Sequence, residues 1–337
     1  MRSLTLALTL AVATTALAHD SWNSGDRCQS RNFRFNDEDA FIEEQIIDAG
    51  ALRSLKASVT HAPISVQGGS GSNYTIKVCK AAARQSDLAQ IHVSVEGGEL
   101  KVSGPAGRNW TAGYVVSMPR GGSVDVETTN GPISIRDVDG TIEAHAQNGP
   151  LSLRNVRGNV NAETHNGPIS VSGSSGTMKV RANNGPLSVD LDGTGWTGDL
   201  DAATKNGPLT LKLPRNYGSS VVVETNGRGP VACRAEECNR NSGSWDSEDG
   251  RWNAPRKLEF GRGPANVRLS TVNGPVTIKD SEERFRAGPR AEGRGPRGLA
   301  RLSVRRLIFR AGNAALGRPP SALGPRPSAL TRLDCDQ

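Results

Sequence analysis

Residues 130–205 read NGPISIRDVDGTIEAHAQ, NGPLSLRNVRGNVNAETH, NGPISVSGSSGTMKVRAN and NGPLSVDLDGTGWTGDLDAATK, four units that each begin with Asn-Gly-Pro. The first three units have the same length, and the fourth is slightly longer. A fixed period of this kind is typical of stacked supersecondary units in which each unit contacts only its neighbours. This stretch therefore predicts a repeat architecture.

The triplet occurs six times, and each of its residues suits a tight corner. Asn tolerates the left-handed conformation and Gly enters it without steric cost, so the pair turns the chain sharply. Pro fixes φ and lacks a backbone donor, which suits the first residue of a strand. The corner residues are Asn130, Gly131, Pro132, Asn148, Gly149, Pro150, Asn166, Gly167, Pro168, Asn184, Gly185, Pro186, Asn206, Gly207, Pro208, Asn273, Gly274 and Pro275. In a stack, we expect the six Asn side chains to form a ladder of amide hydrogen bonds.

Apolar and polar residues alternate on both sides of the turn inside each unit. Ile133 and Ile135 follow one triplet, and Val160 and Ala162 follow the glycine-containing turn of the next unit. A period of two predicts half-buried strands. The sequence therefore predicts an all-β fold, a parallel β-solenoid of the β-helix or β-roll kind with about 18–22 residues per rung. A meander of antiparallel hairpins is the alternative, and the pattern leaves open whether the coil has two faces or three.

The composition changes along the chain and indicates its parts. Residues 1–18 combine Arg2, an apolar core and Ala16-Leu17-Ala18, which predicts a secretory signal peptide cleaved after Ala18. Residues 19–50 are expected to form an N-terminal cap segment over one end of the coil. Residues 51–280 are expected to form the solenoid domain, with a polar loop insertion at 233–256. No later stretch is long and apolar enough to predict a transmembrane segment.

Residues 281–337 form an Arg/Gly/Pro-rich tail that differs from the rest of the chain. They contain 12 Arg and 5 acidic residues, so their charge of 12 − 5 = +7 equals the whole formal net charge. The remaining chain is balanced, with 41 − 12 = 29 basic and 34 − 5 = 29 acidic residues, so the basic pI is no footprint of nucleic-acid binding. We interpret the tail either as a disordered extension or as the product of a shifted reading frame.

Five cysteines and two tryptophans are candidate special residues. Cys233 and Cys238 are close enough in sequence to form one disulfide, and Cys28 and Cys79 are candidates for another, which leaves Cys335 over. No pattern of His and Cys near them indicates zinc. Trp245 and Trp252 in the polar loop are candidate contacts for a sugar ring, with packing of the loop onto the scaffold as the alternative.

Three pairs of aspartates are spaced so that both members leave the same side of an extended chain. They are Asp137 and Asp139, Asp190 and Asp192, and Asp199 and Asp201. The pairs do not recur in register, and the turns between units are too short to build the walls of a catalytic cleft. We therefore predict no catalytic residues, no cofactor and no metal site. His145 and His165 are expected to point outward one rung apart, and we interpret them as solvated surface. The alternative is a small stacked pair that binds a metal ion.

The repeated NGP[IL]S[ILV] units, HAPISV at residues 61–66 and STVNGPVTI at residues 270–278 resemble the bacterial putative adhesin family, an adhesin-like domain of unknown function. The resemblance covers about residues 50–280. It implies a β-solenoid-like fold and export to the cell envelope or beyond, and it supplies no catalytic residues.

The expected function is a non-enzymatic binding or structural role at the bacterial cell envelope. The expected partner is an envelope or extracellular glycan or protein, and not a nucleic acid. The alternatives are an exported carbohydrate-active β-helix enzyme and a purely architectural envelope spacer.

Overall fold

A computed structural model of the chain describes residues 28, 33–107, 109–191, 196–215, 217–226, 229–240, 256–262 and 265–281. All of them belong to one compact unit, Met1–Glu283. Several predictions lie outside the described residues, namely those for the signal peptide, the tail beyond residue 281, Asp192, Trp245, Trp252 and Cys335.

The described chain consists almost entirely of strands, because its period-two alternation runs through nearly every segment. The strands are β1 Arg34–Phe35, β2 Glu38–Asp39, β3 Phe41–Gly50, β4 Ser54–Val59, β5 Ile64–Gly69, β6 Tyr74–Ala82, β7 His92–Glu96, β8 Glu99–Ser103, β9 Trp110–Pro119, β10 Ser123–Asn130, β11 Ile133–Arg136, β12 Thr141–Asn148, β13 Leu151–Asn166, β14 Ile169–Asn184, β15 Leu187–Leu191, β16 Thr197–Asn206, β17 Leu209–Leu213, β18 Ser220–Thr225, β19 Val231–Cys233, β20 Arg256–Phe260, β21 Ala265–Asn273 and β22 Val276–Asp280. Two short helices, α1 Gln85–Leu88 and α2 Glu236–Arg240, accompany them.

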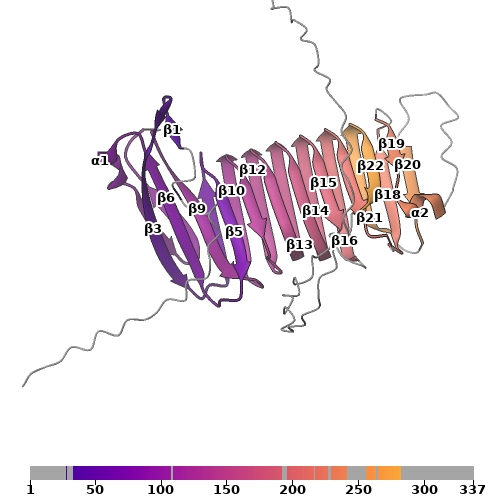
Figure 1. The fold of residues 1–337 in the computed structure, drawn as a ribbon, viewed down its shortest axis with the longest axis horizontal. Coiled ribbons are helices and arrows are strands. Elements are labelled where there is room, and N and C mark those ends of the chain that lie inside the picture. Colours follow the sequence, from indigo (N-terminus) through magenta and orange to yellow (C-terminus); the bar gives the residue numbers. More distant parts are fainter. Residues whose placement is uncertain are drawn as a thin grey trace, which may run out of the picture. The chain divides into compact units, whose positions relative to one another are not determined.

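Twenty of these strands belong to one large sheet that is mostly parallel and curls nearly closed (Figure 1). β1 and β2 pair with each other in a separate two-stranded sheet. β13 and β14 are each 16 residues long. The first half of β13 pairs with β11 and its second half with β12, so a single strand contributes to both faces of the curl. The all-β, mostly parallel fold is therefore confirmed.

Equivalent residues of successive units lie side by side in this sheet. Ile133 is in register with Leu151, which is in register with Ile169, and Ile169 with Leu187. Each of these four side chains is at most 1% exposed. Successive side chains along a strand point to opposite sides, so this column and the matching column of the second strands fill the interior, and the polar residues between them face outward.

The six triplet asparagines form a continuous ladder at one corner of the curl. Each side-chain amide donates a hydrogen bond to the side-chain carbonyl of the asparagine beside it, over 2.8–3.0 Å. The bonds run from Asn148 to Asn130, Asn166 to Asn148, Asn184 to Asn166, Asn206 to Asn184, and Asn273 to Asn206. The corner is therefore fixed by side chains as well as by the backbone.

We expect the Asn166→Ala variant to lose about 1–3 kcal/mol of unfolding free energy, because it removes two neutral hydrogen bonds. One is the bond that Asn166 donates to Asn148, and the other is the bond that it accepts from Asn184. Urea unfolding measures the loss. Asn159→Ala is the matched control, since Asn159 is exposed on the same strand and outside the ladder. An equal loss in both variants would contradict the role of the ladder.

The last strands do not stack in chain order. β21 pairs with β16 on one side and with β18 on the other, and β22 likewise lies between β17 and β19. β20 pairs antiparallel with β18. The unit that begins at Asn273 has the same corner as the unit that begins at Asn206, whereas Asn226-Gly-Arg-Gly-Pro has a longer corner. The corner at Asn273 therefore lies beside the corner at Asn206.

The N-terminal end of the large sheet is antiparallel. β3 pairs antiparallel with β6, and β6 with β9, while β7 and β8 form a hairpin around Gly97 and Gly98. A disulfide joins Cys28 to Cys79 on β6, with Cα atoms 5.2 Å apart. Residues 41–50, assigned to the cap segment from sequence, thus form a strand of the main sheet.

Candidate functional site

The outward side chains of the first strand of each unit include two regular uncharged columns, beside a third column that contains Arg136, Arg154, Asp190, Lys212 and Lys279. One uncharged column consists of the triplet prolines, and the other consists of the hydroxyl residues two positions later. We call these residues the hydroxyl strip: Pro132, Pro150, Pro168, Pro186, Pro208, Pro275, Ser134, Ser152, Ser170, Ser188, Thr210 and Thr277. The hydroxyl residues lie in register across β11, β13, β14, β15, β17 and β22.

The hydroxyl strip is flat, uncharged and accessible. All six prolines are exposed, and the six hydroxyl residues are partly or fully exposed. Adjacent strands are about 4.8 Å apart, so six strands give a strip about 24 Å long, with about 6.6 Å between its columns. Among the described residues, no side chain or backbone group forms a hydrogen bond with these six hydroxyls.

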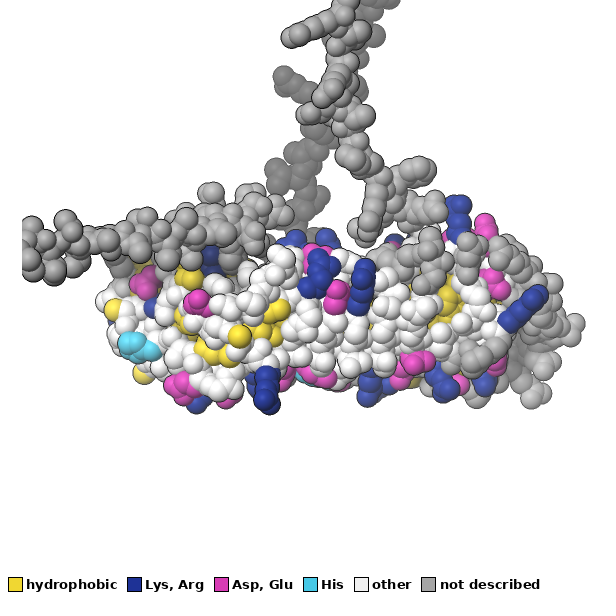
Figure 2. Space-filling view, turned by 90° about the horizontal axis from the view of Figure 1, so that it is seen from below, with side chains coloured by type: hydrophobic (Ala, Val, Ile, Leu, Met, Phe, Trp, Pro, Cys, Tyr) yellow, Lys and Arg dark blue, Asp and Glu magenta, His cyan; other side chains and the backbone are white. Residues whose placement is uncertain are grey.

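The outward side chains of the second strands form a different surface, which carries charge. We call the following residues the charged face: Lys56, Asp125, Glu127, Glu143, His145, Glu163, Lys179, Arg181, Asp201, Lys205, Arg268 and Glu224. They lie on β4, β10, β12, β13, β14, β16, β21 and β18, in that spatial order. Seen from below, charged side chains of both signs line the lower edge of the view, and its middle is mostly uncharged (Figure 2).

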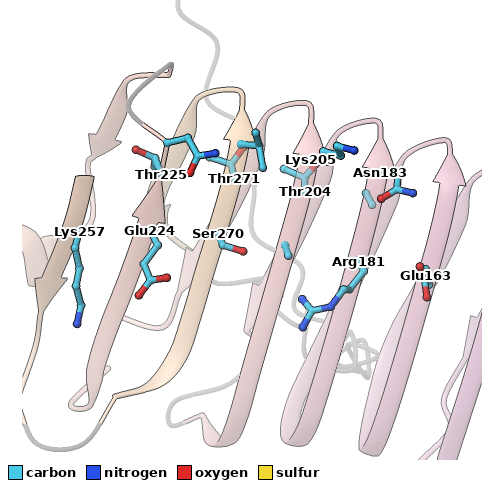
Figure 3. A pocket seen from close by; sticks show the side chains of 14 residues that line it. Glu163, Arg181, Asn183, Thr204, Lys205, Glu224, Thr225, Lys257, Ser270 and Thr271 are labelled. Atoms are coloured by element: carbon cyan, nitrogen blue, oxygen red, sulfur yellow. The ribbon is translucent and has the colours of Figure 1, made fainter. Parts of the chain in front are cut away.

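Part of the charged face is hollowed. Ala203 on β16 and Ser270 on β21 are in register, and their small side chains lie between Arg181 on one side and Glu224 on the other. Lys205 also lines the hollow. Figure 3 shows Glu224 and Ser270 on adjacent strands, and Arg181 beyond the strand that carries Lys205. Side chains of both charge signs therefore line the hollow.

The sequence offers no local signal for this hollow. Ala203 and Ser270 are far apart in the chain, and they become neighbours only because β21 lies between β16 and β18. Aligning the outward positions of the units would have revealed the columns of the hydroxyl strip. It would not have revealed the hollow, because the strand order is not the chain order.

The candidate catalytic acids do not converge on one site. Asp190 Oδ2 accepts a hydrogen bond from Lys212 Nζ over 3.1 Å. Asp201 forms a bidentate ion pair with Arg181, whose guanidinium nitrogens lie 2.6 and 3.2 Å from the two carboxylate oxygens. Asp199 is exposed on the same strand as Asp201. The carboxylates of Asp190 and Asp201 bind side chains of neighbouring units, so they act as cross-strand ties.

Asp137 and Asp139 flank a turn at the opposite corner. Burial raises the pKa of Asp137, but hydrogen bonds from Asn155 and Gln67 and the charges of two arginines outweigh burial and hold this pKa below its usual value. Asp139 lies 4.0 Å from Arg157. The ionised form of Asp137 is therefore the form that the fold favours.

We expect Asp137→Asn to reduce the unfolding free energy by about 1 kcal/mol at neutral pH, because Asn replaces an ionised acceptor while tolerating the positive φ of 57°. A depressed folded-state pKa gives stability that is present above the unfolded pKa, about 3.9, and is lost as the pH falls through the folded pKa. The difference between wild type and variant should therefore shrink below about pH 4. Urea unfolding at neutral pH and below about pH 4 measures this difference in unfolding free energy. Asp199→Asn is the control. A difference that grows in acid would contradict this assignment.

The alternative of a stacked histidine pair is not formed. His145 is in register with Glu163 and not with His165. The two histidines are offset along their strands, because His165 directly precedes its next triplet whereas Ala146 and Gln147 separate His145 from the next triplet. His145 instead lies 3.6 Å from Glu143, and His165 Nδ1 contacts Asn183 Nδ2 over 2.8 Å.

A disulfide joins Cys233 at the end of β19 to Cys238 in α2, with Cα atoms 6.1 Å apart. Within the described parts of the chain, no group of three or more His, Cys, Asp or Glu residues is arranged to hold a metal ion. Neither helix of these residues is long and apolar enough to cross a membrane.

These surfaces belong to a repetitive all-β protein with flat outer faces. No protein-family model matches the chain, and no curated protein matches it. Among solved structures, it is similar to a putative cell adhesion protein from Clostridium sporogenes ATCC 15579, with 15% identity and a TM-score of 0.29, over 72% of this chain and 100% of that chain.

Two further solved structures are similar at the same level. One is a putative adhesin from Bacteroides fragilis NCTC 9343, with 12% identity and a TM-score of 0.34, over 72% of this chain and 97% of that chain. The other is a putative adhesin from Parabacteroides merdae ATCC 43184, with 11% identity and a TM-score of 0.28, over 72% and 96%. At these values the similarities carry no argument about function.

Proposed function

We propose that the chain is an exported, non-enzymatic, adhesin-like protein whose strands form a parallel β-solenoid with one rung per unit of about 18–22 residues. The observation that supports it best is the hydroxyl strip. Its proposed role is to bind an extended glycan at the cell envelope or outside the cell.

The fold does not require hydroxyl residues at the outward positions of the strip. Serine is not among the residues enriched in strands, yet Ser134, Ser152, Ser170 and Ser188 occupy the middle column of four adjacent strands. Their hydroxyls have no hydrogen-bond partner among the described residues. Unpaired hydroxyls at a regular spacing are available to a ligand with a similar repeat.

The chemistry of the strip fits an uncharged sugar polymer. Proline rings offer apolar surface to the C–H faces of sugar rings, and serine and threonine hydroxyls donate to and accept from sugar hydroxyls. The absence of charge within the two columns disfavours strongly ionic ligands. A spacing of about 4.8 Å between strands allows successive sugar rings to meet equivalent residues.

Two of the candidate catalytic carboxylates, Asp190 and Asp201, support a non-enzymatic role. Glycoside hydrolysis requires two carboxyl groups on opposite sides of one bond, about 5–9.5 Å apart. Here Asp190 and Asp201 are tied to Lys212 and Arg181, and they lie on strands of different faces. The strip itself contains no carboxylate.

The two disulfides support export. Disulfides persist in oxidising compartments and are rare in the cytosol. Cys28–Cys79 and Cys233–Cys238 lie near the two ends of the described stack. A signal peptide at residues 1–18 would deliver the chain to such a compartment.

A polysaccharide binding assay tests this function. Wild-type protein is expected to be retained on insoluble neutral polysaccharides and on a glycan array, with a dissociation constant in the micromolar range or tighter. The double variant Ser170→Arg and Ser188→Arg places two long charged side chains in the middle of the strip, so we expect binding to fall at least about tenfold.

The control carries the same charge change on the other face. Asn159 and Thr177 are exposed on β13 and β14 outside the strip, so the variant Asn159→Arg and Thr177→Arg should bind like wild type. Equal losses in both double variants would contradict the strip as the site. Retention of no glycan or envelope partner would favour an architectural spacer, and release of reducing or unsaturated ends would show an enzyme.

A further inference from the structure

The charged face is divided into an acidic half and a basic half. Four carboxylates, Asp125, Glu127, Glu143 and Glu163, lie on the adjacent strands β10, β12 and β13. The next three strands, β14, β16 and β21, carry four cations, Lys179, Arg181, Lys205 and Arg268, with Asp201 among them. The division falls between β13 and β14.

The outer margins of the face reverse these signs. Lys56 on β4 lies beside the acidic half and is 3.6 Å from Asp125. Glu224 on β18 lies beside the basic half. Read along the stack, the order of charge is therefore positive, negative, positive, negative. A two-fold rotation about an axis that lies in the plane of the face and runs along the strands places the acidic half of one copy over the basic half of the other. Asp125 then meets Arg268 and Glu163 meets Arg181, whereas Glu143 meets Asp201.

We infer that the charged face binds the charged face of a second copy of this chain, in an antiparallel, two-fold symmetric dimer. The axis lies in the plane of the interface, between β13 and β14, and runs along the strands, so that Glu163 of each copy meets Arg181 of the other. This inference concerns the face that carries no part of the hydroxyl strip, and it is independent of the proposed function.

The hollow in the basic half also fits the proposed dimer. Counting strands outward from the axis places β12 of one copy over β16 of the other, and β10 over β21. His145 then lies above Ala203 of the second copy, and Glu127 above Ser270. The longer side chains of the acidic half thus face the hollow of the basic half, which Ala203 and Ser270 help to line. Figure 3 shows Ser270 in this lining.

The available area is sufficient for a specific dimer. Eight strands from β4 to β18 span about 34 Å, and strands of six residues are about 20 Å long. Two such faces bury about 1,300 Å² together, which lies at the lower end of the range for specific interfaces. Because most of the interacting groups are exposed charges, the association should be sensitive to salt.

Sedimentation velocity of the full mature chain tests the dimer. We expect a dimer at micromolar concentration in about 50 mM salt and at least tenfold weaker association in about 500 mM salt, where exposed charges are screened. The variant Glu127→Lys and Glu163→Lys makes the face basic, and Lys179→Glu and Arg268→Glu makes it acidic. Each variant alone should associate at least tenfold more weakly than wild type.

Mixing the two variants tests whether complementary charge holds the two copies together. A basic face and an acidic face are complementary, so the mixture should form a heterodimer although neither variant associates with itself. The control Arg154→Glu and Lys279→Glu makes the same charge change at exposed positions of the other face and should dimerise like wild type. A monomeric wild type, undiminished self-association of both variants, or a mixture that stays monomeric would each overturn the inference.

Discussion

Replacing Gly167 with alanine is expected to cost about 3–5 kcal/mol of unfolding free energy, which is among the largest effects of any single substitution in this protein. Gly167 has a φ of +153°, a conformation that residues with a side chain rarely adopt. An added Cβ would lie 2.7 Å from the carbonyl carbon of Gly149 and still closer to its oxygen. Both the corner and the neighbouring unit would have to move.

The cost is large because the corner cannot move alone. Gly167 N donates to Asn184 O over 2.9 Å, and Gly149 N donates to Asn166 O over the same distance. Asn166 and Asn184 also belong to the side-chain ladder. A shift at Gly167 would therefore strain hydrogen bonds to the units on both sides.

Urea unfolding of Gly167→Ala, followed by circular dichroism, measures the effect. Gly121→Ala is the matched control, because an added Cβ there meets no atom within 4 Å, and we expect a change within about 0.5 kcal/mol. If Gly167→Ala lost less than about 1 kcal/mol, the close approach of successive corners would be refuted.

The Leu153→Ala variant is expected to lose about 2–5 kcal/mol, because it leaves a cavity in a core that cannot collapse. Leu153 is 0% exposed and lies in register between Ile135 and Val171. Both neighbouring strands are in regular parallel register with residues 151–153 and are held there by backbone hydrogen bonds. Movement into the cavity would break those bonds.

The neighbouring residue provides the control. Ser152 lies on the same strand but faces outward, so Ser152→Ala should change the unfolding free energy by no more than about 0.5 kcal/mol. Thermal and urea unfolding of both variants compare the two sides of one strand. Equal losses would mean that the inward and outward assignments of β13 are wrong.

The interior and the corners were predictable from sequence because they repeat locally. The alternation at Ile133 and Ile135, and the Asn-Gly-Pro turn before them, are properties of a few consecutive residues. Stacking then follows from equal unit lengths, and it brings the asparagines together. The parallel arrangement of equivalent residues could be derived in this way.

The ends of the stack and the candidate surfaces required long-range pairings. Nothing in the sequence of β21 shows that it lies between β16 and β18, because both outer partners precede it in the chain. The antiparallel pairing of β3 with β6 likewise depends on a strand that is distant in sequence, with β4 and β5 between them. The histidine pair failed for a related reason, since a small offset within similar units changes which residues are neighbours.

Cysteine cross-linking across the hollow tests the order of the strands most directly. In the structure, Ala203 is in register with Ser270 on the adjacent strand, while Glu224 lies one strand further away. Adjacent strands bring Cα atoms to about 4.8 Å, within the limit for a disulfide, whereas about 9.6 Å exceeds it. We predict that mild oxidation links Ala203→Cys to Ser270→Cys in the double variant, with the linked peptides identified by mass spectrometry. A link between Ala203→Cys and Glu224→Cys instead would show that the units stack in chain order, and it would contradict the structure described above.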